Sequence, residues 1–459
     1  MRNNINRVML ADSYKYSQPL QYPKNTTYMF NYMEARSGDS PVVVFTGVQY
    51  VLRKYFSEPI RQWEVNEAYE FAQVHGEPFD KEGWDYIVQE LGGRLPVRIR
   101  AVKEGSVIPI RHVLMTMEST DEKVFWIPGF METVMMKLWY PTSVATKAYG
   151  VRKMIEKYLT ETGTPEALDF KYHNFGDRGA TSVESASIAG IAHLTQFLGT
   201  DNFNALRDAK RYYNDPCAGY SIPASEHSTV TSWGREGRFE MYDKYIETFK
   251  NHCVIACVMD SYDIYEDVRY VTSGTFKEKI ESSDYPKFVI RPDSGDPVKV
   301  IRRLLEIMEE NNVKCTVNDK GYKVFDKYAF IWGDGISPEV IDQILMEVIS
   351  NGYSADIIAF GSGGDLAQNV NRDTHGFAIK CSAVTINGKV RDVFKDPITD
   401  PGKISKKGVL ELMKVLDGSY YVTVPRTPST VDNSELITVF ENGDIKINDT
   451  LDQIRERSR

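Results

Sequence analysis

From about residue 168 the chain alternates between short apolar runs and amphipathic segments. The apolar runs predict strands at residues 168–175, 253–259, 287–290, 328–332 and 356–360. Helices are predicted over residues 182–197, from Pro297 behind an Asp296 cap, from Pro338 behind Ser337, and more briefly after Gly364. Continuous apolar strands separated by such helices are typical of parallel strands that are buried on both faces.

The first 150 residues are less regular. Strands are predicted at residues 27–32 and 42–45, and helices at 48–56 and 63–74, where apolar positions recur three and four apart. We predict an α/β protein with a barrel-like catalytic domain at residues 166–379 and a second, α+β domain at residues 1–165, completed by residues 380–459. A barrel is favoured because successive strand–helix units occur without a dinucleotide-binding fingerprint.

Composition narrows the class of protein. The 459 residues are 42% apolar and 26% charged, as in ordinary globular proteins, and the net charge of −9 disfavours nucleic acid and anionic membranes as partners. No apolar window is long enough for a membrane span, and the N-terminus has no apolar core, so a cytoplasmic protein is expected. Five scattered cysteines agree with a reducing compartment. A local basic stretch contains Lys395, Lys403, Lys406 and Lys407; a solvated loop explains it equally well.

The run Gly361 to Gly364 follows a predicted strand and opens a helix. Glycines at such a place let backbone N–H groups approach phosphate oxygens, although a plain tight turn remains an alternative. The phosphate-binding patterns of dinucleotide-binding folds and of P-loops are both absent.

Charged residues occur at two further strand ends. Arg291 and Asp293 place a guanidinium beside a carboxylate, which suits a phosphate or amide oxygen together with ribose hydroxyls or Mg²⁺. A structural ion pair is the alternative. Asp334 lies between Gly333 and Gly335, so the pattern fits either a ligand-binding carboxylate or an ordinary Asp-Gly turn.

Aromatic and polar residues follow other strands. Phe175 and Arg178 flank a glycine turn and could stack a flat ring beside a phosphate. A core aromatic residue next to a surface arginine explains the pattern equally well. Asp201 could accept hydrogen bonds from an amide. Asp260 and Asp263 follow a buried strand and could cap the next helix or order the site by hydrogen bonds.

His227 stands between Glu226 and Ser228 in a segment without clear periodicity. A neighbouring carboxylate can orient a histidine as a base or phosphate acceptor, whereas an isolated histidine is more often structural. His252, Cys253 and Cys257 lack the spacing of a zinc site, so no metal-binding cluster of side chains is predicted.

Eight motifs occur in the order found in nicotinamide phosphoribosyltransferases, of the type II phosphoribosyltransferase family, which the chain resembles from about residue 8 to 450. The motifs begin at Asp12 (DSYK), Gly176 (GDRG), Ser225 (SEHST), Asp260 (DSYDIY), Arg291 (RPDSG), Gly333 (GDG), Ala359 (AFGSGG) and Phe394 (FKDP). The resemblance implies an irregular α/β barrel with a second domain, and a homodimer with active sites at the interface.

The implied reaction joins nicotinamide to phosphoribosyl pyrophosphate, giving nicotinamide mononucleotide and pyrophosphate in NAD salvage, with Mg²⁺ as cofactor and ATP as co-substrate. His227, beside Glu226, would be phosphorylated by ATP. Displacement at the anomeric carbon needs stabilisation of the leaving group rather than a strong base. Nicotinate phosphoribosyltransferase is the nearest alternative, and a non-catalytic nucleotide-binding regulator on the same fold is another.

The resemblance also implies roles for individual residues. Phe175 and the partner subunit's Tyr14 would sandwich the pyridine ring, while Asp201 and Arg291 would bind the carboxamide. The ribose-phosphate part would be bound by Arg178, Asp293, Gly333, Asp334, Gly363 and Gly364. Asp12 and Asp260 are also implied to bind substrate. Pyrophosphate or ATP phosphates would meet Arg36, Arg372, Lys380 and Lys395. Asp177, where vertebrate relatives carry tyrosine, and a short loop at residues 37–41 depart from the family pattern.

Overall fold

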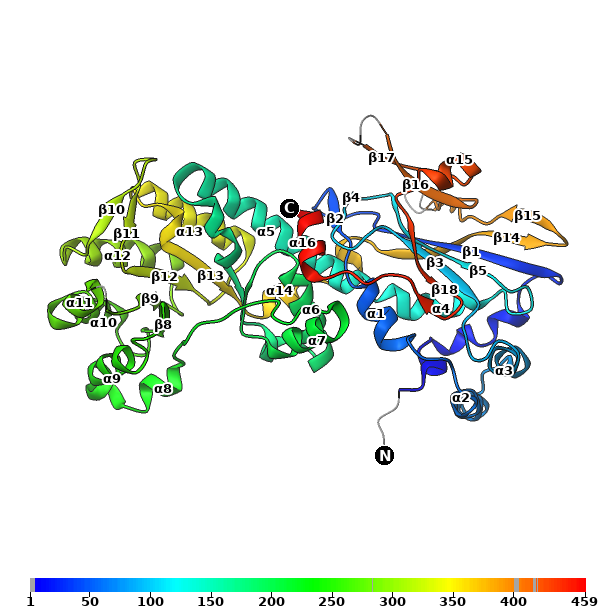
Figure 1. The fold of residues 1–459 in the computed structure, drawn as a ribbon, viewed down its shortest axis with the longest axis horizontal. Helices are drawn as coiled ribbons and strands as arrows, with labels where there is room; N and C mark the ends of the chain where they lie inside the picture. The colour runs from blue at the N-terminus through cyan, green and yellow to red at the C-terminus, as the bar shows by residue number, and fades with distance from the viewer. Residues whose placement is uncertain (1–4, 283, 400–403, 416–417, 419) are drawn as a thin grey trace. The chain divides into compact units, whose positions relative to one another are not determined.

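The chain forms two compact units, which Figure 1 traces from blue to red. The computed structural model describes residues 5–282, 284–399, 404–415, 418 and 420–459. Unit 1 comprises Met1–Thr146, Ala209–Asp215 and Val370–Arg459, and unit 2 comprises Lys147–Asp208 and Pro216–Asn369. The domain boundaries expected after residues 165 and 379 stay a prediction. Within the described ranges, no helix is long and apolar enough to cross a membrane.

Unit 2 is built on six parallel strands in the order β7-β6-β13-β12-β9-β8. Their bounds are β6 (Tyr172–Asn174), β7 (Gly199–Thr200), β8 (Val254–Val258), β9 (Lys287–Arg291), β12 (Tyr328–Trp332) and β13 (Ile358–Ser362). Segment 220–225 bridges both edges of this sheet, because Tyr220 pairs with Gly199 and Ala224 pairs with Ala256. The sheet is thereby closed into an irregular barrel, which confirms the predicted fold class.

Small and branched side chains fill the inside of the barrel. Ala256, Val289 and Ile331 are buried together, and Phe175 packs against them with other partly buried residues of β8, β12 and β13. Strands that are covered on both faces need apolar residues on both, which explains the continuous apolar runs in the sequence.

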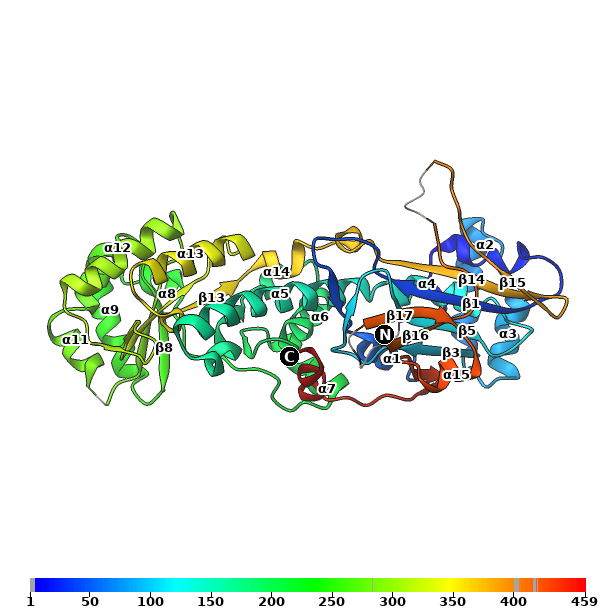
Figure 2. The same cartoon turned by 90° about the horizontal axis from the view of Figure 1, so that it is seen from above.

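Helices cover the outside of the barrel strands, as Figures 1 and 2 show for α10 to α13. The helices that lie wholly in unit 2 are α6 (Val183–Leu194), α8 (His227–Thr231), α9 (Gly234–Thr248), α10 (Ile264–Val271), α11 (Gly274–Glu281), α12 (Pro297–Glu310), α13 (Pro338–Ser350) and α14 (Gly364–Gln368). Helices α5 (Trp139–Thr162) and α7 (Phe203–Tyr213) have residues in both units. Asp296 and Ser337 cap α12 and α13 as predicted, each accepting a backbone N–H from the first turn. A small hairpin, β10 (Cys315–Val317) with β11 (Lys323–Phe325), completes the unit.

Three predicted element bounds are partly wrong. The strand predicted at residues 168–175 is only β6, because Pro165–Phe170 forms a 3₁₀ helix. The strand predicted from residue 356 begins at Ile358, after the 3₁₀ turn Ala355–Ile357. Apolar residues in these turns contact the core without joining the ladder, and hydropathy cannot separate the two states. The helix predicted over residues 182–197 is α6, which ends at Leu194.

Unit 1 contains a seven-stranded antiparallel sheet in the order β15-β14-β1-β5-β3-β18-β19. Its strands are β1 (Thr26–Glu34), β3 (Val97–Ala101), β5 (Val113–Ser119), β14 (Ala378–Ile386), β15 (Lys389–Asp392), β18 (Ile437–Glu441) and β19 (Asp444–Ile445). The helices are α1 (Val48–Tyr55), α2 (Gln62–His75), α3 (Lys81–Gln89), α4 (Ile127–Met136), α15 (Pro428–Asp432) and α16 (Leu451–Ser458), and β2 (Val42–Val44) pairs with β4 (Val107–Pro109). The predicted strands and helices of this region are confirmed.

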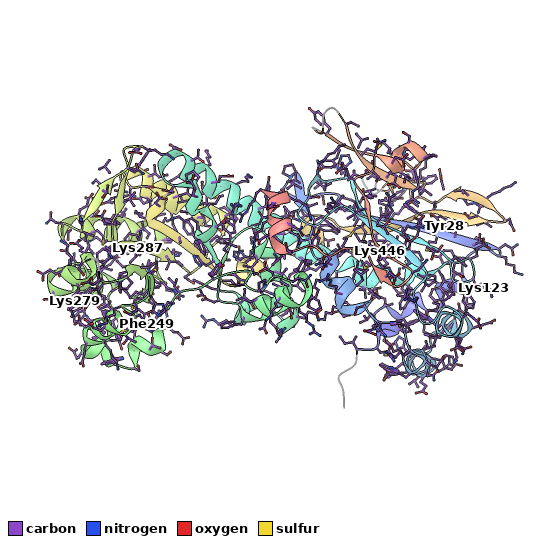
Figure 3. All side chains as sticks on the ribbon, in the orientation of Figure 1. Tyr28, Lys123, Phe249, Lys279, Lys287 and Lys446 are labelled. Carbon is purple, nitrogen blue, oxygen red and sulfur yellow. The ribbon has the colours of Figure 1, made fainter. Side chains whose placement is uncertain are left out.

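A charged network attaches the hairpin β16 (Leu410–Val415) and β17 (Tyr420–Pro425) to the sheet of unit 1. Tyr28, labelled on β1 in Figure 3, donates a hydrogen bond to Glu118. Arg426 bonds both Glu118, at 2.8 Å, and the buried Glu411, at 2.7 Å. Buried carboxylates need such partners, so the network fixes where the hairpin lies.

Candidate active site

A pocket of about 490 Å³ opens at the carboxyl ends of β6, β9, β12 and β13 in unit 2. This volume is typical of small-molecule sites, and the carboxyl ends of parallel strands are where barrels place them. The lining residues are Phe175, Arg178, Gly179, Arg291, Asp293, Gly333, Asp334, Gly335, Ile336, Ser337, Gly363, Gly364 and Asp365.

Arg291 and Asp293 lie side by side on the wall of the pocket. The guanidinium bonds the carboxylate at 2.9 Å, and the two side chains stay 21% and 17% exposed. Gly333 makes this possible, because a Cβ at that position would stand 2.9 Å from Asp293 Oδ1. Arg291 and Asp293 therefore form the ion pair that the sequence left open as an alternative to ligand binding. The pair also lines the pocket, and both side chains can make further hydrogen bonds there.

Phe175 follows β6, and its ring crosses the backbone of β13 at Gly361. A Cβ on Gly361 would lie only 2.0 Å from Phe175 Cε2, so this position has no room for any side chain. The Arg291 guanidinium lies 5.4 Å from the ring centroid. An aromatic ring with a cation beside it is thus held at the strand ends, which suits a flat polar heterocycle.

Other polar groups in the lining of the pocket are free to meet a ligand. Within the residues that the structure describes, the exposed side chains of Arg178 and Asp334 make no hydrogen bond or ion pair. Cβ atoms on Gly363 and Gly364 would meet nothing within 4 Å, so the backbone there borders open space. A guanidinium, a carboxylate and accessible backbone groups can together bind phosphate and sugar hydroxyls.

His227 begins α8, and its oriented partner is Asp260, two residues after β8. Nε2 lies 2.9 Å from Asp260 Oδ1. The histidine side chain is 44% exposed, whereas that of Asp260 is only 6% exposed. Glu226, the neighbour considered from the sequence, instead caps α8 and accepts a hydrogen bond from Ser228 at 2.8 Å. The partner of the histidine therefore comes from the end of β8 and not from its neighbour in sequence.

Asp263, the other acid of its motif, caps α10 by accepting the N–H groups of Tyr265 and Glu266. Each of the two hypotheses for these acids therefore holds for one of them. Asp260 orients the histidine, and Asp263 caps the helix.

Asp201 follows β7 and is exposed outside the set of pocket-lining residues. Its N–H donates to the carbonyl of Asn174, the residue before Phe175, which places it beside the strand end that carries the ring. Ser221 Oγ donates to its Oδ1 at 2.6 Å. One carboxylate oxygen is thereby oriented, and the other accepts no hydrogen bond from the residues that the structure describes.

The remaining predicted residues lie in unit 1. Asp12 accepts a hydrogen bond from Thr133, and Tyr14 is 55% exposed. Arg36 donates to the carbonyl of Gly376, and Arg372 pairs with its neighbour Asp373.

Lys380 lies near three other cations of unit 1. Burial and the nearby Arg36 lower its pKa, Lys395 and Lys406 lower it further, and Glu34 opposes them. An excess of positive charge that is only partly balanced within the unit favours binding of an anion.

Five lining residues were not among the predicted site residues. Gly179 and Gly335 end the runs that begin at Gly176 and Gly333, so the predicted site residues beside them could have pointed to both glycines. Ile336, Ser337 and Asp365 follow strand ends by several residues, and only the folded turns bring them to the pocket. Asp365 is paired with Lys147 at 2.5 Å.

Comparison with known proteins identifies the family of the chain. The family model of the nicotinate phosphoribosyltransferase (NAPRTase) family matches residues 170–444, and that of the nicotinamide phosphoribosyltransferase N-terminal domain matches residues 6–99. A nicotinamide phosphoribosyltransferase of Xanthomonas campestris pv. campestris is 45% identical, over 98% of this chain and 97% of its own. One from Acinetobacter baylyi is 30% identical, over 100% and 98%.

Solved structures support the fold. Nicotinate-nucleotide pyrophosphorylase from Pyrococcus furiosus aligns with a TM-score of 0.62 at 16% identity, covering 100% of this chain and 95% of that one. Human nicotinic acid phosphoribosyltransferase aligns with a TM-score of 0.60 at 14% identity, covering 98% and 93%. Together with the full-length relatives, the family models establish that this chain belongs to the nicotinamide phosphoribosyltransferases within the nicotinate phosphoribosyltransferase family.

Proposed function

We propose that this chain transfers the phosphoribosyl group of phosphoribosyl pyrophosphate to nicotinamide in the cytoplasm, forming nicotinamide mononucleotide and pyrophosphate for NAD salvage. The observation that carries the proposal is the pocket at the barrel's carboxyl edge, where the Phe175 ring, the Arg291–Asp293 pair and the free Arg178 and Asp334 line one cavity. These groups match the three parts of the product: a flat ring, a ribose and a phosphate.

The ring would bind against Phe175, with its carboxamide oxygen toward the Arg291 guanidinium. Asp201 would accept the amide NH₂ through the oxygen that Ser221 leaves free. A carboxylate attracts an amide donor and repels the carboxylate of nicotinate, so Asp201 favours nicotinamide over nicotinate. This is the physical ground for preferring the amide substrate.

The ribose-phosphate part would bind between Asp293, Asp334 and the glycine run at Gly363. Ribose hydroxyls suit the carboxylates, and the 5′-phosphate suits the open backbone and Arg178. As pyrophosphate leaves, the anomeric carbon becomes positively charged, and fixed carboxylates nearby stabilise that charge. The unprotonated pyridine nitrogen needs no base, so positioning carries most of the catalysis.

Mg²⁺ fits this site only together with the substrate. It often binds through one or two carboxylates plus substrate phosphates, and Asp334 offers an unpaired carboxylate. No group of three metal-binding side chains exists among the described residues. When bound, Mg²⁺ would neutralise charge on the pyrophosphate.

His227 is proposed to accept the γ-phosphoryl group of ATP. As a carboxylate, Asp260 would accept a hydrogen bond from Nε2–H, which would leave the lone pair of Nδ1 free to react. Nδ1 would form the N–P bond as ADP leaves, and water would later release phosphate. The basic groups of unit 1 (Arg36, Arg372, Lys380 and Lys395) would meet pyrophosphate or ATP phosphates, several of them from the second subunit of a homodimer, with the partner subunit's Tyr14 against the ring.

Product analysis with nicotinamide and nicotinate in parallel, with and without ATP, tests the proposal. Nicotinamide mononucleotide should form, and nicotinate should be the poorer substrate. Formation of nicotinate mononucleotide alone would favour the nicotinate reaction, and no product from either base would favour a non-catalytic nucleotide-binding regulator.

Two variants test the residue roles. Asp201→Asn should lower kcat/KM for nicotinamide by about 10- to 100-fold, the loss of a charged hydrogen bond, and narrow the preference over nicotinate. Asp319→Asn, at an exposed turn, is the matched control. His227→Ala should abolish stimulation by ATP and retain residual basal synthesis, with His252→Ala as control. Unchanged selectivity, or stimulation that survives in His227→Ala, would contradict the respective role.

A further inference from the structure

A hydrogen-bonded chain connects His227 to the wall of the pocket. His227 Nε2 bonds one oxygen of Asp260 at 2.9 Å, and Ser294 Oγ donates to the other oxygen, Oδ2. Asp260 is nearly buried, with 6% of its side chain exposed. Each oxygen of a buried carboxylate needs a donor, so both contacts are required for Asp260 to hold one position.

Ser294 directly follows Asp293, and its turn is short. β9 ends at Arg291 and α12 begins at Pro297, so five residues join them. Gly295 takes φ +90°, and Asp296 is fixed as the helix cap through the N–H of Lys299. In so short a turn, anchored at both ends, the backbone positions of Ser294 and the adjacent Asp293 are closely linked.

The backbone adds a second link between the two strand ends. Met259, next to Asp260, donates its N–H to the carbonyl of Arg291 at 3.1 Å. Residues 259 and 260, which follow β8, are therefore hydrogen-bonded to the Arg291–Asp293 turn at two points. One is the carbonyl of Arg291, and the other is the side chain of Ser294. A hydrogen-bonded path thus runs from His227 through Asp260 to the turn that carries Asp293.

We propose that Ser294 is a positioning residue that couples the phosphorylation state of His227 to the Arg291–Asp293 wall of the pocket. This rests on the proposed function. Transfer of a phosphoryl group from ATP to Nδ1 forms an N–P bond, breaks a P–O bond and releases ADP. The added negative charge stands beside Asp260 and changes how strongly that carboxylate holds Nε2. Ser294 passes the resulting shift of Asp260 to Asp293.

The test measures coupling rather than activity alone. For Ser294→Ala, the ratio of synthesis with ATP to synthesis without ATP should fall by about tenfold or to no stimulation, the effect of losing a hydrogen bond to a charged group. ADP released per nicotinamide mononucleotide formed should rise, because His227 is still phosphorylated but no longer linked to the pocket. A serine needed only for folding would lower both reactions and leave that stoichiometry unchanged.

Three companion variants sharpen the result. Ser294→Thr keeps the hydroxyl and should restore the wild-type stoichiometry, and Ser294→Cys, a weaker donor of similar size, should fall between Thr and Ala. If the alanine variant does not fold, ATP stimulation and ADP stoichiometry are measured on the cysteine variant instead. Ser350→Ala, at the exposed end of α13, is the control.

The outcomes separate the two proposals. Wild-type protein that makes no nicotinamide mononucleotide refutes the proposed function. Wild-type protein that makes product and is stimulated by ATP, alongside a Ser294→Ala variant with unchanged stimulation and stoichiometry, refutes the coupling and leaves the function standing. Failure of threonine to restore coupling would also overturn the role of the hydroxyl.

Discussion

Gly361→Ala tests the placement of the Phe175 ring. The new Cβ would lie 2.0, 2.3 and 2.9 Å from three ring carbons, Cε2, Cδ2 and Cζ. Ordinary contact begins at 3.4 Å, so the nearest ring carbon must retreat by 3.4 − 2.0 = 1.4 Å. The ring packs against the barrel core, so such a displacement costs about 1–3 kcal/mol of folding stability.

The functional effect should exceed the loss of stability. A misplacement of about 1 Å at a substrate-positioning group can cost about 100-fold in rate, which corresponds to about 2.7 kcal/mol. We expect kcat/KM for nicotinamide to fall by that factor, with a rise in KM for nicotinamide that is larger than the rise for phosphoribosyl pyrophosphate. Steady-state kinetics with each substrate varied in turn gives both values.

A double-mutant cycle with Phe175→Ala isolates the contact. Without the ring, Gly361→Ala should have little further effect, because the atoms it would strike are gone. Gly150→Ala, inside helix α5 where an added Cβ meets nothing within 4 Å, is the matched control. Wild-type kcat/KM in Gly361→Ala, or the same loss whether or not the ring is present, would refute the reasoning.

Two further predictions concern charge. Arg178→Ala should raise KM for phosphoribosyl pyrophosphate by about 10- to 100-fold, since it removes a charged hydrogen-bond donor that has no partner among the described residues; an unchanged KM would remove Arg178 from the phosphate site. Burial lowers the pKa of His193 from 6.5 to about 3, so between those values the unfolded chain binds a proton that the folded chain does not. The free energy of unfolding should therefore fall by up to about 1.4 kcal/mol per pH unit below pH 6.5, and urea titrations at pH 7 and 5 should show a smaller fall in His193→Phe.

The sequence alone determined which residues stand at the ends of the strands. Arg291, Asp334 and Gly363 each follow an apolar run, and parallel strands bring their carboxyl ends to one edge whatever their order in the sheet. Local signals also fixed two helix starts, because Asp296 and Ser337 each precede a proline and satisfy an N–H of their own first turn. Both inferences depend on neighbours in sequence, so no tertiary knowledge was needed.

Closure of the barrel was decided only by the tertiary structure. Segment 220–225 joins both sheet edges through backbone bridges, and its residues carry no strand-like periodicity. Backbone hydrogen bonds do not depend on side-chain pattern, so hydropathy gave no sign of them. The two 3₁₀ turns before β6 and β13 escaped prediction for the same reason.

The partners of the site residues were likewise decided by the fold. His227 is oriented by Asp260, which lies 33 positions along the chain, and not by its neighbour Glu226. Phe175 depends on the absence of a side chain at Gly361, on a strand far away in sequence. A sequence can reveal that a histidine, a carboxylate and an aromatic ring are present. Which atoms meet depends on strand order and on the direction of each side chain, and packing sets both.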